Sequence, residues 1–149
     1  MKVAALGLVL TCFVAACSMP PAGQLFHTTL LHRSPSNPTG DYPLPVAIGD
    51  QTELVVGIEP AEGDQGGGPE PFVRLDPADP NALILTWVGG MCDNDAAVSF
   101  RPSGSGYALH LDVHGKLGFG CPAAGILRGL RIVASKAIEI RAIAVSGAG

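Results

Sequence analysis

The sequence predicts a small β-sandwich, and three observations favour this fold class. Short apolar runs rich in β-branched residues recur from about residue 46 onward. Turn-forming residues separate these runs, in a chain that contains 20 Gly and 13 Pro. One segment, Tyr107 to Val113, alternates apolar and polar residues, as a strand with one buried face does. We therefore expect a mainly antiparallel sandwich, Ig-like or similar, over residues 46–149.

The central strands are expected where apolar runs lie between turn signals. Gly89 and Gly90 end one run, and a Pro-Ser-Gly-Ser-Gly turn at residues 102–106 separates two others. The expected strands cover residues 54–58, 83–88, 97–100 and 107–113.

The two C-terminal segments, residues 126–134 and 138–145, admit two interpretations. Their apolar residues also fit a helical spacing, and few helix breakers lie between residues 124 and 144. The β-branched residues Ile132, Val133 and Ile138 favour strands. We expect strands here, with a helix over residues 124–144 as the alternative.

Residues 1–16 have the features of a secretory signal peptide. Lys2 gives a positive start, and the apolar run that follows is shorter than the roughly 20 residues needed to span a bilayer. The ending Val14-Ala15-Ala16-Cys17 resembles the lipobox of bacterial lipoproteins. This resemblance implies cleavage before Cys17, a fatty acid such as palmitate on its thiol, and anchorage on the extracytoplasmic side of the cell membrane. The alternative is an ordinary signal peptide cut near Ala16.

Residues 17–45 are expected to form a lipid-anchored flexible tether, and the folded domain is expected to begin at residue 46. Six prolines among polar residues interrupt any hydrophobic period in this stretch. His27 and His32 fall within it, and we expect solvent around both. A short strand near residues 25–31 is the one ordered piece that the pattern suggests.

Cys92 and Cys121 are the thiols that remain once the signal peptide is removed and Cys17 carries lipid. Two such thiols in an exported domain are usually joined. The chain has no Cys-x-x-Cys motif, which a thioredoxin-like redox pair would need. We expect a structural disulfide between Cys92 and Cys121, closing a loop of about 30 residues.

His110, Asp112 and His114 are candidate metal ligands. On a strand they would point to one face with neighbours about 7 Å apart, and imidazole with carboxylate suits zinc or copper. His110 and His114 would be about 13 Å apart along a straight strand, which makes it difficult for one ion to bind all three residues. We favour the alternative, in which these residues form the solvated face of an amphipathic strand.

Charge and motifs argue against several functional classes. The formal net charge is −4 and no basic stripe is visible, which disfavours nucleic-acid binding. The nucleophile elbow, the His-Glu-x-x-His zinc motif, the P-loop and the dinucleotide fingerprint are absent from the sequence.

We therefore expect a membrane-anchored envelope lipoprotein with a non-catalytic binding or structural role and no cofactor. Its expected partners are the membrane, through the lipid, and another envelope protein or a glycan. Two alternatives remain open: a zinc- or copper-binding protein that uses His110, Asp112 and His114, and a small exported hydrolase.

Overall fold

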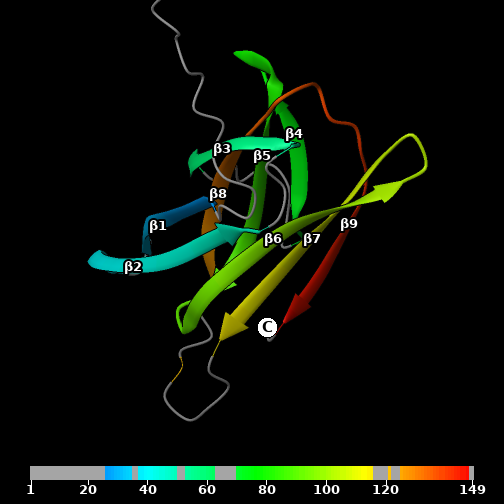
Figure 1. Ribbon diagram of the computed structural model, residues 1–149. Helices are drawn as coiled ribbons and strands as arrows, with labels where there is room; N and C mark the ends of the chain where they lie inside the picture. The colour runs from blue at the N-terminus through cyan, green and yellow to red at the C-terminus, as the bar shows by residue number, and fades with distance from the viewer. Residues whose placement is uncertain are drawn as a thin grey trace, which may run out of the picture.

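Two β-sheets packed face to face form the sandwich that the sequence predicts (Figure 1). The computed structural model describes residues 26–34, 37–49, 53–62, 70–115, 121 and 125–147. The strands of these regions are β1 (Phe26–Ser34), β2 (Asn37–Ile48), β3 (Val55–Pro60), β4 (Phe72–Asp76), β5 (Asp79–Gly90), β6 (Asp93–Ser103), β7 (Gly106–Gly115), β8 (Gly125–Ala134) and β9 (Ile140–Gly147).

One sheet has the strand order β1-β2-β6-β7-β9, and the other has the order β3-β8-β5-β4. Most neighbouring strands are antiparallel, as predicted, but β2 pairs with β6 and β7 pairs with β9 in parallel. The strands of the two sheets cross each other, and β1 contacts both β3 and β8 of the opposite sheet (Figure 1). The described residues include no helix long and apolar enough to cross a membrane.

The core lies between the inner faces of the two sheets. Alternate residues of each strand point inward, as the two-residue period of a strand requires. In β7 the inward residues Leu109, Leu111 and Val113 are buried, and in β8 Leu130 and Ile132 are buried. The predicted alternation from Tyr107 to Val113 is therefore confirmed, and its apolar members face the opposite sheet.

The hairpin between β6 and β7 shows how a local sequence fixes the geometry at one end of a sheet. Gly104 has a φ of 60°, a left-handed conformation that glycine adopts without strain. Beyond the turn, Phe100 and Tyr107 pack edge to face with ring centroids 6.5 Å apart. The predicted turn at residues 102–106 is correct.

The N-terminal boundary of the domain differs from the prediction. Much of the stretch assigned to the tether forms β1 and β2, which pair with each other along most of their length. Leu30 and Leu44 are fully buried in the core, so these strands are part of the domain. The expected boundary at residue 46 was wrong because prolines were read as evidence against strands.

The C-terminal segments are strands rather than a helix. β8 pairs with both β3 and β5, so it lies inside its sheet, and β9 lies at the edge of the other sheet. This outcome agrees with the abundance of β-branched residues in both segments.

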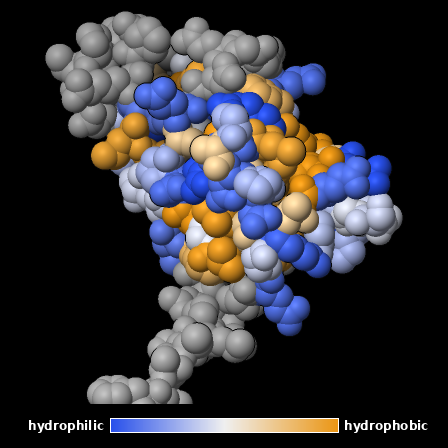
Figure 2. Space-filling view, turned by 90° about the horizontal axis from the view of Figure 1, so that it is seen from above, coloured by the Kyte–Doolittle hydropathy of each residue, from blue (hydrophilic) through white to orange (hydrophobic). Residues whose placement is uncertain are grey.

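The surface of the sandwich is mixed in character. On the face seen in Figure 2, hydrophobic residues form small patches separated by hydrophilic residues. The large hydrophobic residues that are most exposed lie on five different strands: Leu31, Val56, Leu75, Val88 and Val145. Single exposed residues of this kind are ordinary for a folded domain.

We expect Leu130→Ala to lower the free energy of unfolding by about 2 to 5 kcal/mol, because the substitution leaves a cavity between the sheets. Leu130 is 0% exposed, whereas Leu75 of the same sheet is 58% exposed. Leu75→Ala, the control, should change the stability by less than about 0.5 kcal/mol. Urea unfolding followed by circular dichroism measures both; equal losses would contradict this assignment of the core.

Candidate functional site

A disulfide joins Cys92 to Cys121, as predicted. Cys92 lies in the turn between β5 and β6, and Cys121 lies in the connection between β7 and β8. The two Cα atoms are 5.9 Å apart, and 29 residues separate the cysteines in the sequence. The bond therefore joins two connections that each pass from one sheet to the other, because β5 and β8 belong to one sheet and β6 and β7 to the other.

Four polar or aromatic side chains meet between the two sheets. His32 and Tyr42 are directly opposite each other on β1 and β2, and Trp87 and Arg128 are directly opposite each other on β5 and β8. The guanidinium of Arg128 donates from Nη1 to the backbone oxygen of Tyr42, 2.5 Å away, and so connects the two pairs. We call these four residues the inter-sheet cluster.

The inter-sheet cluster contains polar atoms that are buried and unpaired. Arg128 is 1% exposed and Trp87 is 2% exposed. Arg128 Nε, Trp87 Nε1 and His32 Nδ1 are all buried, and in the part of the chain that the structure describes they have no hydrogen-bond partner. A buried donor without a partner costs about 1 to 3 kcal/mol, so three in one place are unusual for a site with only a structural role.

Gly89 leaves space beside this cluster. A Cβ atom on Gly89 would lie 3.5 Å from Trp87 Nε1, 3.6 Å from Arg128 Cγ and 2.6 Å from Asp93 Oδ2. The absence of a side chain on Gly89 thus allows the indole N–H, the arginine and the carboxylate of Asp93 to approach one point. Asp93 Oδ2 accepts a hydrogen bond from the backbone N–H of Gly90, 2.7 Å away.

Burial governs the charges in the cluster. It lowers the pKa of Arg128, and the negative charge of Asp93 opposes that shift. Burial also lowers the pKa of His32, and the nearby Arg128 charge lowers it further. Both effects favour the neutral form of His32 near pH 7, and Arg128, which stays protonated in proteins, carries the positive charge of the cluster.

His110, Asp112 and His114 lie on the outer face of β7, where the sequence placed them. His114 Nδ1 is 2.6 Å from Asp95 Oδ1, on the neighbouring strand β6, and His114 Nε2 is 3.4 Å from Asp112 Oδ2. The two carboxylates approach different nitrogens of the His114 ring. A metal ion bound to one of these nitrogens could therefore not also contact both carboxylates. Within the described ranges no three His, Cys, Asp or Glu side chains are grouped closely enough to hold a metal.

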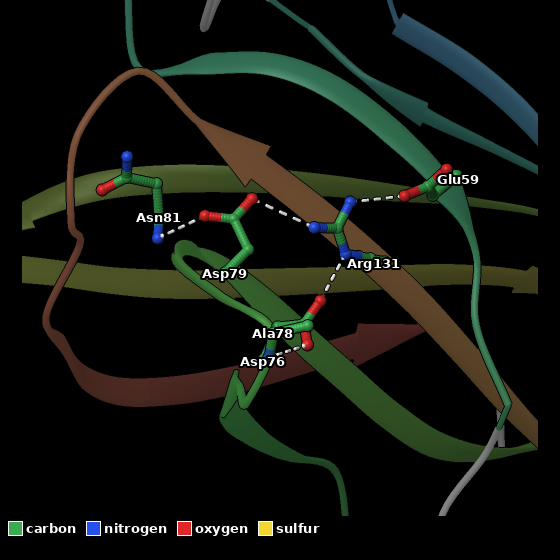
Figure 3. A network of polar contacts seen from close by, with 6 residues as sticks. All are labelled: Glu59, Asp76, Ala78, Asp79, Asn81 and Arg131. Atoms are coloured by element: carbon green, nitrogen blue, oxygen red, sulfur yellow. Dashed lines mark hydrogen bonds and ion pairs between the residues drawn. The ribbon is translucent and has the colours of Figure 1, made fainter.

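A second polar network lies on the outer face of the four-stranded sheet (Figure 3). Arg131 of β8 forms ion pairs with Glu59 of β3, with Asp76 Oδ2 at 2.5 Å and with Asp79 Oδ2 at 3.0 Å. These contacts lower the pKa of Asp76 and raise that of Arg131. Asp76 and Asp79 also accept hydrogen bonds from the backbone N–H groups of Ala78 and Asn81, at the β4–β5 turn and the start of β5. The network therefore connects all four strands of this sheet.

Sequence reasoning missed the inter-sheet cluster. It expected solvent around His32 and gave no binding role to Trp87 or Arg128. Trp87 is buried, and its indole N–H has no hydrogen-bond partner among the described residues. Cys17 and the expected signal peptide lie outside the described residues.

Comparisons with protein families, with curated proteins and with solved structures find no match to this chain.

We expect the double variant Cys92→Ser/Cys121→Ser to lose about 3 to 4 kcal/mol of stability, because the disulfide no longer restricts the unfolded chain. Chemical unfolding of the variant beside the wild type measures this loss. As a control, a thiol reductant should destabilise the wild type by a similar amount and leave the double variant unchanged. A reductant-insensitive wild type would contradict a stabilising disulfide.

His32 and His114 should titrate on opposite sides of the ordinary pKa of 6.5. The hydrogen bond to Asp95 and the charge of Asp112 raise the pKa of His114, so its stabilising effect is complete below 6.5 and disappears as pH rises through the raised pKa. Burial and Arg128 lower the pKa of His32. Its contribution to the stability of the fold is therefore complete above pH 6.5 and is lost as pH falls through the lowered pKa.

Imidazole NMR titration of the wild type measures both shifts, with His32→Gln and His114→Gln used to assign the signals. In Asp95→Asn the pKa of His114 should move back toward 6.5 while that of His32 stays in place. Two histidines that titrate together would rule out these environments.

Proposed function

We propose that this chain is a lipid-anchored protein of the bacterial cell envelope with a non-catalytic binding role. The observation that carries the proposal is the sequence Val14-Ala15-Ala16-Cys17 at the end of a short apolar run. Its position suits acylation of Cys17 and retention of the folded domain on the extracytoplasmic side of the membrane. The anchor would determine where the protein acts, and the β-sandwich would carry the binding activity.

The disulfide between Cys92 and Cys121 supports the extracytoplasmic location. Disulfides persist in oxidising compartments and are rare where thiols are kept reduced. A signal peptide and a disulfide are independent features of the sequence and the fold, and both are typical of exported proteins.

The inter-sheet cluster supports a binding role. It brings together an arginine, a tryptophan, a histidine and a tyrosine, and three of their buried polar atoms have no hydrogen-bond partner among the described residues. Side chains with unused hydrogen-bonding capacity can hold and orient a ligand group. A ligand on another envelope molecule, either a protein or a glycan, would suit a domain held at the membrane.

We expect Cys17→Ser to release the protein from the membrane fraction, because a serine hydroxyl does not accept the lipid. Cell fractionation with immunoblotting measures the distribution, and the intact mass of the mature wild type should show acyl chains on Cys17. Cys12→Ser is the matched control, because it alters the other cysteine of the leader and should leave the membrane association unchanged. Retention of the Cys17→Ser protein in membranes would contradict the anchor.

A further inference from the structure

The three unpaired atoms of the inter-sheet cluster define the chemistry of what can bind there. Arg128 Nε and Trp87 Nε1 are donors only, and His32 Nδ1 donates or accepts according to its tautomer. A partner must therefore offer hydrogen-bond acceptors, and a hydrocarbon group would leave all three atoms unpaired.

We propose that the inter-sheet cluster binds an oxyanion group, a carboxylate or a phosphate, through Arg128 and Trp87. The inference rests on the proposed binding function and names the class of its ligand. Arginine is suited to this task because its planar guanidinium presents several N–H donors that match the oxygens of a carboxylate or phosphate.

A charged ligand fits better than a neutral one because of how Arg128 is surrounded. The guanidinium is buried, and it donates a hydrogen bond to a neutral backbone oxygen, that of Tyr42. Asp93 acts on Arg128 through its charge, but its Oδ2 atom is bonded to the N–H of Gly90. Among the described residues Arg128 has no carboxylate in direct contact, and an oxyanion would supply such a contact together with acceptor oxygens.

The missing side chain of Gly89 leaves room for polar groups beside Trp87 Nε1 and Arg128 Cγ. The carboxylate of Asp93 takes part of that room, because its Oδ2 atom lies 2.6 Å from the point that a Cβ on Gly89 would occupy. His32, Tyr42 and Asp93 are only half-buried, so the cluster is closest to solvent on their side. A ligand group that enters there must share this space with the carboxylate of Asp93, or displace it, to reach Arg128 and Trp87.

The test uses the fluorescence of Trp87, which is the only tryptophan of the chain. The full-length protein in mild detergent is titrated with sodium acetate and, separately, with sodium phosphate, at an ionic strength held constant with sodium chloride. We expect a saturable change in Trp87 emission with at least one of the two oxyanions, and the melting temperature should rise with the same concentration dependence. Acetate and phosphate together distinguish a carboxylate ligand from a phosphate ligand.

Acetamide is the matched neutral probe, since it has the shape of acetate without its charge, and it should produce no saturable change. Arg128→Met should weaken oxyanion binding by about tenfold or more, because a hydrogen bond to a charged group typically contributes that much affinity. Arg141→Met removes the same charge from an exposed position on β9 and should bind as the wild type does.

The proposal is overturned if neither oxyanion changes the emission or melting temperature of the wild type, if acetamide acts as acetate does, or if Arg128→Met and Arg141→Met respond alike. The wild-type titrations decide the matter even if Arg128→Met does not fold. If the wild type stays in the membrane fraction but binds neither oxyanion, the oxyanion site is contradicted and the lipid anchor is not. If the wild type binds an oxyanion but is not held in the membrane fraction, the lipid anchor is contradicted and the oxyanion site is not.

Discussion

Apolar contact between the inner faces of the two sheets determines where the other features of the molecule can lie. Strands of both sheets place alternate residues in this interface, and Leu30, Leu44, Leu111 and Leu130 are fully buried within it. The same alternation continues beyond the apolar region, so the next inward positions on β1, β2, β5 and β8 also face one another. Those positions hold the inter-sheet cluster, whose buried polar atoms are therefore a consequence of strand register.

The fold class could be predicted because a two-residue period and β-branched residues are local signals. The extent of the domain could not be predicted, because prolines such as Pro43 and Pro45 are also typical of linkers. In the structure these prolines lie on β2, which pairs with β6 only over Val46–Ile48. The part of β2 that holds both prolines thus pairs with β1 on one side and has an unpaired edge on the other. A proline whose nitrogen faces an unpaired edge removes no hydrogen bond from the sheet.

The disulfide could be predicted from the number of cysteines, whereas the inter-sheet cluster could not be predicted from any single segment. His32 and Arg128 are far apart in the sequence and meet only because β1 packs on β8. His110, Asp112 and His114 share a face, as a strand requires, but the stronger partner of His114 is Asp95 on the adjacent strand. Contacts within one strand can be read from spacing, and contacts between strands need the register.

The start of β1 at Phe26 has a consequence for how the domain would stand on a membrane. On a chain anchored at Cys17, only residues 18–25 separate the lipid from the first strand, a reach of roughly 30 Å at most. His32 lies farther along β1, about 20 Å from Phe26 at the usual rise per residue. The anchored end of the domain and the inter-sheet cluster would then lie toward opposite ends of β1, so the linker would not join the domain beside the cluster.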